Sequence, residues 1–246
     1  RANIAVPGTQ SGIGVTFGRS NIEYRAEYGH LPHSDRAHMF AISPGGSTYF
    51  PGNPFIAPEA DTRHKYAITT ADSILTPFEA GWGARGAEKL HTPYVHHIAY
   101  MESLYQRIAA DQKKIIVVGN GGFYSLLEIN DSIRRGFEIM LIKDSGRFAE
   151  LAAHMVEHPS VLEAFAKGSS GDAKLLHLIR TSMPESSAQE LCQKDFGHRE
   201  NPENEDYQIY RDTLRIFARI IQNDVDKIAI TPLSQLEGAL RARMQK

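Results

Sequence analysis

The sequence predicts an α/β protein in which helices alternate with the strands of a doubly wound, mostly parallel sheet. Residues Ile115–Val118 form a short, continuously apolar, β-branched run, which is typical of a strand buried on both faces of a parallel sheet. Apolar residues at helical spacing follow, and a second apolar run occupies Ile139–Ile142. Each run ends in a loop that opens a helix. Ligands of open α/β sheets bind at the carboxyl ends of the strands, so these two loops are where a site is first expected.

The N-terminal part of the chain is expected to add three strands and a helix. Short apolar runs predict strands at Ile4–Val6, Met39–Ser43 and Tyr66–Thr69. Residues 44–64 are rich in proline and glycine without periodicity, which predicts a long loop. Apolar residues at helical spacing predict a helix over Thr92–Ala110.

The C-terminal part is expected to be mainly helical, with residues 159–222 as a helical insertion. Strand–helix alternation at both ends favours one Rossmann-like domain over residues 1–246 rather than two domains. Because the chain begins at Arg1, almost directly on an apolar run, we expect a fragment of a longer protein. The expected helices are Phe148–Val156, Val161–Lys167, Ala173–Arg180, Ala188–Lys194, Asp206–Ile221 and Leu233–Met244, and the last expected strand is Val225–Ile230.

Composition limits the classes of function. The 246 residues carry a net charge of −2 and scattered basic residues, so there is no bulk electrostatic attraction to nucleic acid. The single cysteine, Cys192, excludes an internal disulfide and fits a reducing compartment. No apolar run approaches the length of a membrane span, so we expect a cytoplasmic protein without a membrane segment. The histidines lack metal-binding spacing, and no metal is expected.

A first glycine-rich turn, Gly8-Thr9-Gln10-Ser11-Gly12, follows the first expected strand. Small residues let the backbone approach a phosphate, and the two hydroxyls can donate hydrogen bonds. The turn is not a Walker A loop, because no Gly-Lys-Ser/Thr follows, and it lacks the third glycine of the dinucleotide fingerprint. A phosphate loop and a tight turn that binds nothing are equally compatible with these residues.

A second glycine-rich turn, Gly119–Glu128, matches part of the pattern P-G-G-x-G-T-x-x-E. The alternative is a plain turn with a carboxylate that the helix dipole favours. After the next strand, Arg147 stands at a helix start, and arginine is the best side-chain partner of phosphate. Its alternative is a surface arginine in an ion pair. Within the pattern, Gly121, Gly122, Glu128 and Ser125 (in the threonine place) agree, whereas Asn120 and Tyr124 replace the proline and the third glycine.

Five motifs in order resemble the SLOG superfamily and, within it, the LSDAT group, which is related to the N-terminal region of melastatin-type TRP channels. The resemblance covers most of residues 3–158, and Val225–Leu240 is similar to the closing strand and helix of the family. The matching motifs are Gly8–Gly14, the Pro44-Gly45 turn, Gly81-Trp82-Gly83, Gly119–Ile129 and Asp144–Glu150.

This resemblance implies a Rossmann-like fold that binds nucleotides or nucleotide-derived molecules. Many bacterial members look like sensors fused to effectors in antiviral defence systems, and ligands of the superfamily include ADP-ribose-type signals. A separate branch, the LOG proteins, hydrolyses nucleoside monophosphates with the glutamate that Glu128 matches and with an arginine from an M-x-x-R-K-type motif. The segment Met101–Leu104 departs from that motif and Tyr124 adds bulk, and both departures favour a sensor over a hydrolase.

We therefore expect a sensor of a phosphate-containing nucleotide or NAD-derived ligand, with no catalytic residue and no cofactor. The alternatives are a LOG-type phosphoribohydrolase that uses Glu128, and an assembly module with a vestigial pocket. Tyr94, Tyr100 and Tyr105 predict a homodimer or larger homo-oligomer, although these rings could simply cover the sheet. The expected ligand-binding residues are Gly8, Thr9, Gln10, Ser11, Gly12, Pro44, Gly45, Gly46, Gly119, Asn120, Gly121, Gly122, Ser125, Glu128, Lys143, Ser145, Gly146 and Arg147.

Overall fold

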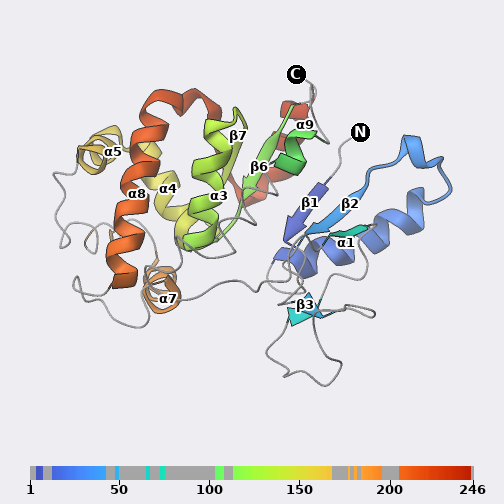
Figure 1. Cartoon of the computed structure of the whole chain (residues 1–246), viewed down its shortest axis with the longest axis horizontal. Helices are drawn as coiled ribbons and strands as arrows, with labels where there is room; N and C mark the ends of the chain where they lie inside the picture. Colours follow the sequence, from blue (N-terminus) through green and yellow to red (C-terminus); the bar gives the residue numbers. More distant parts are fainter. Residues whose placement is uncertain are drawn as a thin grey trace. The chain divides into compact units, whose positions relative to one another are not determined.

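The chain divides into two compact units, Arg1–Ser103 and Leu104–Lys246, in a computed structural model (Figure 1). Each unit contains a parallel sheet of three strands, so the predicted α/β class and parallel pairing are confirmed. The structure describes residues 4–7, 13–42, 48–49, 65–66, 73–75, 103–107, 113–167, 177, 180–181, 184–195 and 205–244.

The N-terminal unit has the strand order β1-β2-β5, and the helix α1 follows β1. A second, two-stranded sheet pairs β3 with β4 in parallel. The predicted loop over residues 44–64 therefore contains a short strand, which two residues are too few to reveal by periodicity. The bounds are β1 Ile4–Pro7, α1 Ile13–Tyr28, the 3₁₀ helix η1 His33–Asp35, β2 Met39–Ile42, β3 Thr48–Tyr49, β4 Lys65–Tyr66 and β5 Ser73–Leu75.

The sheet of the C-terminal unit has the order β6-β7-β8, with β6 at Ile115–Val118, β7 at Glu138–Lys143 and β8 at Ile228–Pro232. Its central strand, β7, is buried along four consecutive residues, Ile139–Ile142. A strand with parallel neighbours on both edges and cover on both faces excludes water from every side chain, which explains the uninterrupted apolar run. The strands predicted at Ile115–Val118 and Ile139–Ile142 are confirmed as neighbours, with Ile116 opposite Ile139.

Several helices pack with this sheet around one apolar core, and Figure 1 shows α3, α4 and α8 gathered beside β7. The apolar positions of α8, Tyr210, Leu214, Phe217 and Ile221, recur at helical spacing and are fully buried. The helices are α3 Phe123–Arg134, α4 Arg147–Glu157, α5 Pro159–Ala166, α7 Glu185–Asp195, α8 Glu205–Asp224 and α9 Leu236–Met244, preceded by a helical stretch at residues 103–107.

A glycine turn connects the end of α3 to β7. Gly136 has a φ of 82°, its N–H donates to Ile133 O at 3.0 Å, and the Phe137 N–H donates to Ser132 O at 3.0 Å. This is the Schellman arrangement, in which a left-handed glycine satisfies the last carbonyls of a helix. The following Phe137 is only 3% exposed, so the turn delivers the chain into the core at the start of β7.

Two sequence expectations at the C-terminal end are wrong in detail. Residues 225–227 of the predicted strand Val225–Ile230 form a 3₁₀ turn, η4, and pairing starts at Ile228. Leu233 was expected to begin the last helix, but it lies in a second 3₁₀ turn, η5 (Leu233–Gln235), and is 58% exposed. Pro232 has no N–H to donate, which fits its place as the last residue of β8 and the N-cap of η5.

Within the described part of the chain, no helix combines the length and apolarity that crossing a bilayer requires.

Candidate functional site

The loops that follow β6 and β7 meet at the carboxyl edge of the C-terminal sheet. Because β6 and β7 are parallel neighbours, the turn Gly119–Gly122 and the turn Asp144–Gly146 leave the sheet side by side. Ten residues predicted to bind the ligand belong to these loops or to the adjoining ends of β7, α3 and α4: Gly119, Asn120, Gly121, Gly122, Ser125, Glu128, Lys143, Ser145, Gly146 and Arg147. The other predicted residues, Gly8–Gly12 and Pro44–Gly46, lie outside the described residues.

Hydrogen bonds join the two loops. The Asn120 N–H donates to Ser145 Oγ at 2.8 Å, and the Asn120 side-chain amide donates to the Ser145 carbonyl at 3.2 Å. The Ser145 hydroxyl in turn donates to the Ile142 carbonyl at 2.6 Å. The Arg147 guanidinium donates from Nη1 to Asn120 Oδ1 at 3.2 Å. Asn120 and Ser145 therefore hold one loop against the other, and Arg147 is aimed at this junction.

Unusual backbone conformations concentrate here. Among the described residues, three non-glycine residues have positive φ: Asn120 (58°), Asp144 (66°) and Arg147 (46°). Asparagine and aspartate tolerate the left-handed region because their short polar side chains can hydrogen-bond locally, whereas arginine is strained there. Such conformations persist where surrounding contacts impose them, and they cluster at ligand sites. Within the described residues, these two loops and the first residue of α4 thus hold every non-glycine residue with a positive φ.

The start of α4 is occupied by the protein itself. The Ala149 N–H donates to the Asn120 carbonyl at 2.9 Å, and the Phe148 N–H donates to the Gly121 carbonyl at 3.4 Å. A helix presents its first four N–H groups to an anion only where nothing else accepts from them. Carbonyl groups of the neighbouring loop thus serve as the cap of α4, and a phosphate would have to displace them.

The start of α3, like that of α4, has a glycine N-cap, and a serine hydroxyl lies close to its turn. Its N-cap, Gly122, has extended backbone angles, and no side chain caps the helix. At Gly121, where φ is 74°, an added Cβ would lie 2.8 Å from the Ser125 hydroxyl oxygen. The glycine is therefore required both by its conformation and by the close approach of Ser125. The turn presents main chain and one hydroxyl with little side-chain bulk, which is what an anion site at a helix start needs.

Two charged groups beside the loops are already paired. Lys143 Nζ lies 2.8 Å from Glu157 Oε2, and this bond raises the pKa of Lys143 above its usual value. Glu150, which is 7% exposed, accepts the Asp144 N–H at 2.6 Å on Oε2. The role of Glu150 was not predicted; the signal was a carboxylate in the first turn of a helix, where it can reach back to a preceding N–H.

Glu128 lies in the second turn of α3 and is half-buried. The arrangement as a whole offers a helix start, a hydroxyl and a guanidinium, which together can hold an oxyanion.

No group of three or more histidine, cysteine, aspartate or glutamate side chains suited to a metal ion occurs among the residues that the structure describes. No protein-family model matches the chain, and no curated protein matches it.

Proposed function

We propose that the protein is a sensor domain that binds a phosphate-containing nucleotide or NAD-derived molecule, with the phosphate at the start of α3. One observation carries this proposal: the turn Gly119–Gly122 opens α3 with glycine backbone and without a side-chain cap, while the α4 start is filled. The partial positive charge of a helix start attracts anions. Ser125 supplies a hydroxyl, and Arg147 supplies a guanidinium that Asn120 orients.

The sheet geometry supports the same proposal. In each unit by itself, the strands of the three-stranded sheet lie side by side in chain order, as β1-β2-β5 and as β6-β7-β8. Each is the order found in one half of a doubly wound, nucleotide-binding sheet. The single Rossmann-like sheet and the SLOG/LSDAT assignment stay predictions, as does an effector controlled by this sensor in a bacterial antiviral defence system.

The binding test uses calorimetry with ADP-ribose, AMP and NAD as probes. We expect Arg147→Ala to weaken binding roughly tenfold or more, because a charge-assisted hydrogen bond is typically worth about 1.5–3 kcal/mol. Arg134→Ala is the matched control, since it removes the same charge from the far end of α3. Unchanged affinity in a folded Arg147→Ala protein removes Arg147 from the site, and absence of binding by all probes contradicts the nucleotide proposal.

Turnover separates the sensor from the LOG-type hydrolase. Incubation with nucleoside monophosphates and NAD, followed by chromatography, should give no free base. The reason is that the chain lacks the arginine motif of the hydrolases and carries Tyr124 in place of a glycine. Base release at enzymatic rates that disappears in Glu128→Gln would establish the hydrolase instead.

We also propose that the protein is a homo-oligomer, but Tyr105 does not support this proposal. The Tyr105 ring packs against the core of its own unit, with its centroid 6.5 Å from that of the Phe137 ring. This agrees with the alternative that the tyrosine rings cover the protein's own core. Tyr94 and Tyr100 lie outside the described residues. Light scattering with and without a bound nucleotide tests the proposal, and a mass of 27.4 kDa under both conditions contradicts it.

A further inference from the structure

The first turn of α7 lies against the loop that leads into α4. A Cβ added to Gly146, the N-cap of α4, would lie 3.1 Å from the Ser187 hydroxyl oxygen and 3.5 Å from the Asn120 side-chain nitrogen. Gly146 is buried although it has no side chain of its own. Ser187 of α7 and Asn120 of the loop before α3 therefore approach the same point beside Gly146.

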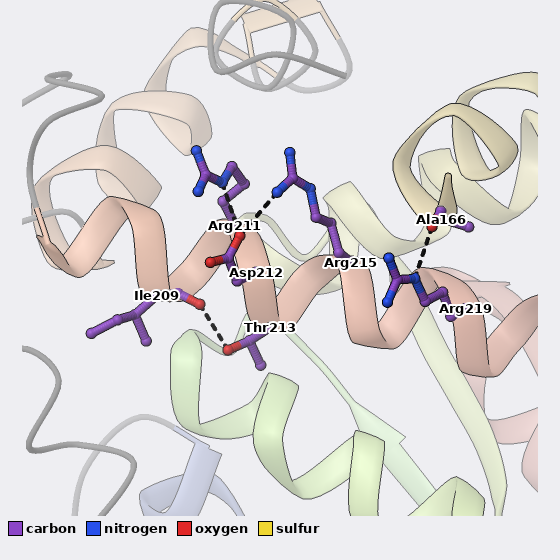
Figure 2. Close-up of polar contacts among 7 residues, drawn as sticks. All are labelled: Ala166, Ile209, Arg211, Asp212, Thr213, Arg215 and Arg219. Carbon is purple, nitrogen blue, oxygen red and sulfur yellow. Dashed lines mark hydrogen bonds and ion pairs between the residues drawn. The ribbon is translucent and has the colours of Figure 1, made fainter. Parts of the chain in front are cut away.

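Packing fixes the position of Ser187. The next residue, Ala188, is 5% exposed and belongs to the apolar core of this unit, and its N–H donates to the Pro184 carbonyl at 3.0 Å. The helix α7 packs against α4 and α8. In turn, α8 is held to α5 by Arg219, whose Nε donates to the Ala166 carbonyl at 2.8 Å (Figure 2). The Ser187 hydroxyl thus has a defined place beside the loop, and such preorganisation lowers the cost of binding.

The Ser187 hydroxyl is available to a ligand. It forms no hydrogen bond with any residue that the structure describes, and Ser187 is half-buried, so solvent reaches part of it. The Asn120 amide donates to the Ser145 carbonyl at 3.2 Å, and its oxygen accepts from Arg147. An amide nitrogen carries two hydrogens, so one donor remains beyond the contacts that the described residues make. Two hydrogen-bond donors are therefore close to Gly146.

We infer that Ser187 is a further ligand-binding residue, whose hydroxyl donates to an oxygen of the phosphate-containing ligand beside the Asn120 amide. The inference rests on the proposed function, since it places the same ligand at the same two loops and adds a contact from α7. The hydroxyl, the amide and the Arg147 guanidinium are three kinds of donor, and the phosphate and ribose oxygens of a nucleotide accept from each of them.

The alternative is that Ser187 only fills the space beside Gly146. A serine side chain is small enough for this close approach, but an alanine side chain is smaller still, so packing does not require a hydroxyl. The two interpretations differ in what the hydroxyl does for binding. If it only fills space, its removal leaves the affinity unchanged, whereas a hydroxyl that contacts the ligand is needed for full affinity.

Calorimetry with ADP-ribose, AMP and NAD tests the inference on the intact chain. We expect Ser187→Ala to weaken binding about fivefold, the scale of one hydrogen bond from a neutral donor. Ser186→Ala is the matched control, because it removes the same group from the neighbouring, exposed position of the same turn, and it should leave binding unchanged. The urea midpoint of Ser187→Ala should equal that of the unchanged protein, since the hydroxyl bonds to no described residue.

A second pair of variants places a charge at the same two positions. Ser187→Asp sets a carboxylate beside an anionic ligand and should weaken binding by about tenfold or more, because like charges brought together repel. Ser186→Asp should have a clearly smaller effect, since its side chain is exposed. Aspartate is favourable in the first turn of a helix, so neither change should unfold α7.

The outcomes separate this inference from the proposed function. Unchanged binding in Ser187→Ala, together with weakened binding in Arg147→Ala, would overturn the role of Ser187 and leave the proposed function standing. Equal losses in the Ser186 and Ser187 variants, or a lowered urea midpoint that accounts for the weaker binding of Ser187→Ala, would also overturn it. Absence of binding by every probe to the unchanged protein would contradict both.

Discussion

The starts of α3 and α4 occupy equivalent places in the fold but differ in their main-chain hydrogen bonds. Both helices follow neighbouring parallel strands and begin at the same edge of the sheet. The α4 start donates its Phe148 and Ala149 N–H groups to carbonyls of the loop that leads into α3. Both starts have a glycine N-cap and no side-chain cap, and the α3 start has in addition a hydroxyl at Ser125. Position at a strand end alone therefore does not make a helix start an anion site.

The difference follows from how the two loops depend on each other. The loop before α3 turns the Asn120 and Gly121 carbonyls toward α4, and both residues have a positive φ. The loop before α3 thus caps α4 with its carbonyls, whereas we propose that the start of α3 receives the anion. Substitutions that act on one start and not on the other test this division.

The largest effect is expected from Phe148→Ala in the first turn of α4. Phe148 is fully buried and meets the Phe217 ring of α8 edge-on, with centroids 5.5 Å apart. Removing it should cost about 3–5 kcal/mol, the usual loss for a buried phenylalanine. Leu126→Ala, in the first turn of α3, should cost about 2–5 kcal/mol, and Leu233→Ala, at an exposed leucine, less than about 0.5 kcal/mol. Urea titrations of the intact chain measure all three, and a small loss for Phe148→Ala would show that α4 is not anchored by its start.

The second effect concerns the turn into α3. Gly121→Ala should destabilise the protein by about 2–3 kcal/mol, because a Cβ there combines a left-handed backbone with a clash against Ser125. Gly136→Ala is a matched control: its φ is 82°, but nothing lies within 4 Å of the added Cβ. It should therefore cost only the backbone term, about 1 kcal/mol. Equal losses in the two variants would remove the close approach of Ser125 from the argument.

A third, smaller effect separates two serines. Ser145→Ala removes a hydroxyl that accepts the Asn120 N–H and donates to Ile142 O, so it should cost about 1–2 kcal/mol of stability. Ser125→Ala should leave stability within about 0.5 kcal/mol and weaken nucleotide binding about fivefold, since its hydroxyl is proposed to donate to the phosphate. Calorimetry and urea titration on both variants test the assignment. A reversed pattern, with Ser125 structural and Ser145 needed for binding, would exchange the roles of the two loops.

The sequence predicted the elements of the C-terminal unit well where one property repeats along the chain. The uninterrupted apolar run of β7 and the helical spacing of Leu126, Ile129 and Ile133 correspond to one environment each, buried on both faces or on one stripe. Short features were not predicted from the sequence. The strand Thr48–Tyr49 is too short to show periodicity, and a 3₁₀ turn replaces the start of the last predicted strand. Such boundaries depend on tertiary contacts and not on local pattern.

The residues around the candidate site were predicted by their chemistry, but their partners were not. Glycine turns, Ser145 and Arg147 stand where strand ends predicted them. That Lys143 would pair with Glu157, and that Asn120 would accept from Arg147, depends on residues 14 and 27 positions apart in the chain. No local pattern encodes such pairs. Only the packing of α4 and the two loops determines which of the predicted polar groups remains available to a ligand.

The smallest effect is expected at the other end of α4, where the charge state of His154 should report on packing. Burial lowers the pKa of His154 below its usual 6.5, and the charges of His158 and Lys143 act in the same direction, while Glu157 opposes them. Its ring stacks on His158 with centroids 4.1 Å apart. A lowered pKa means that the folded state binds fewer protons than the unfolded state, so stability should fall as the pH drops below about 6.5. Urea midpoints measured between about pH 7 and about pH 5 should decline less steeply in His154→Gln. An identical decline in the variant would show that protonation of His154 does not contribute to the loss of stability at low pH.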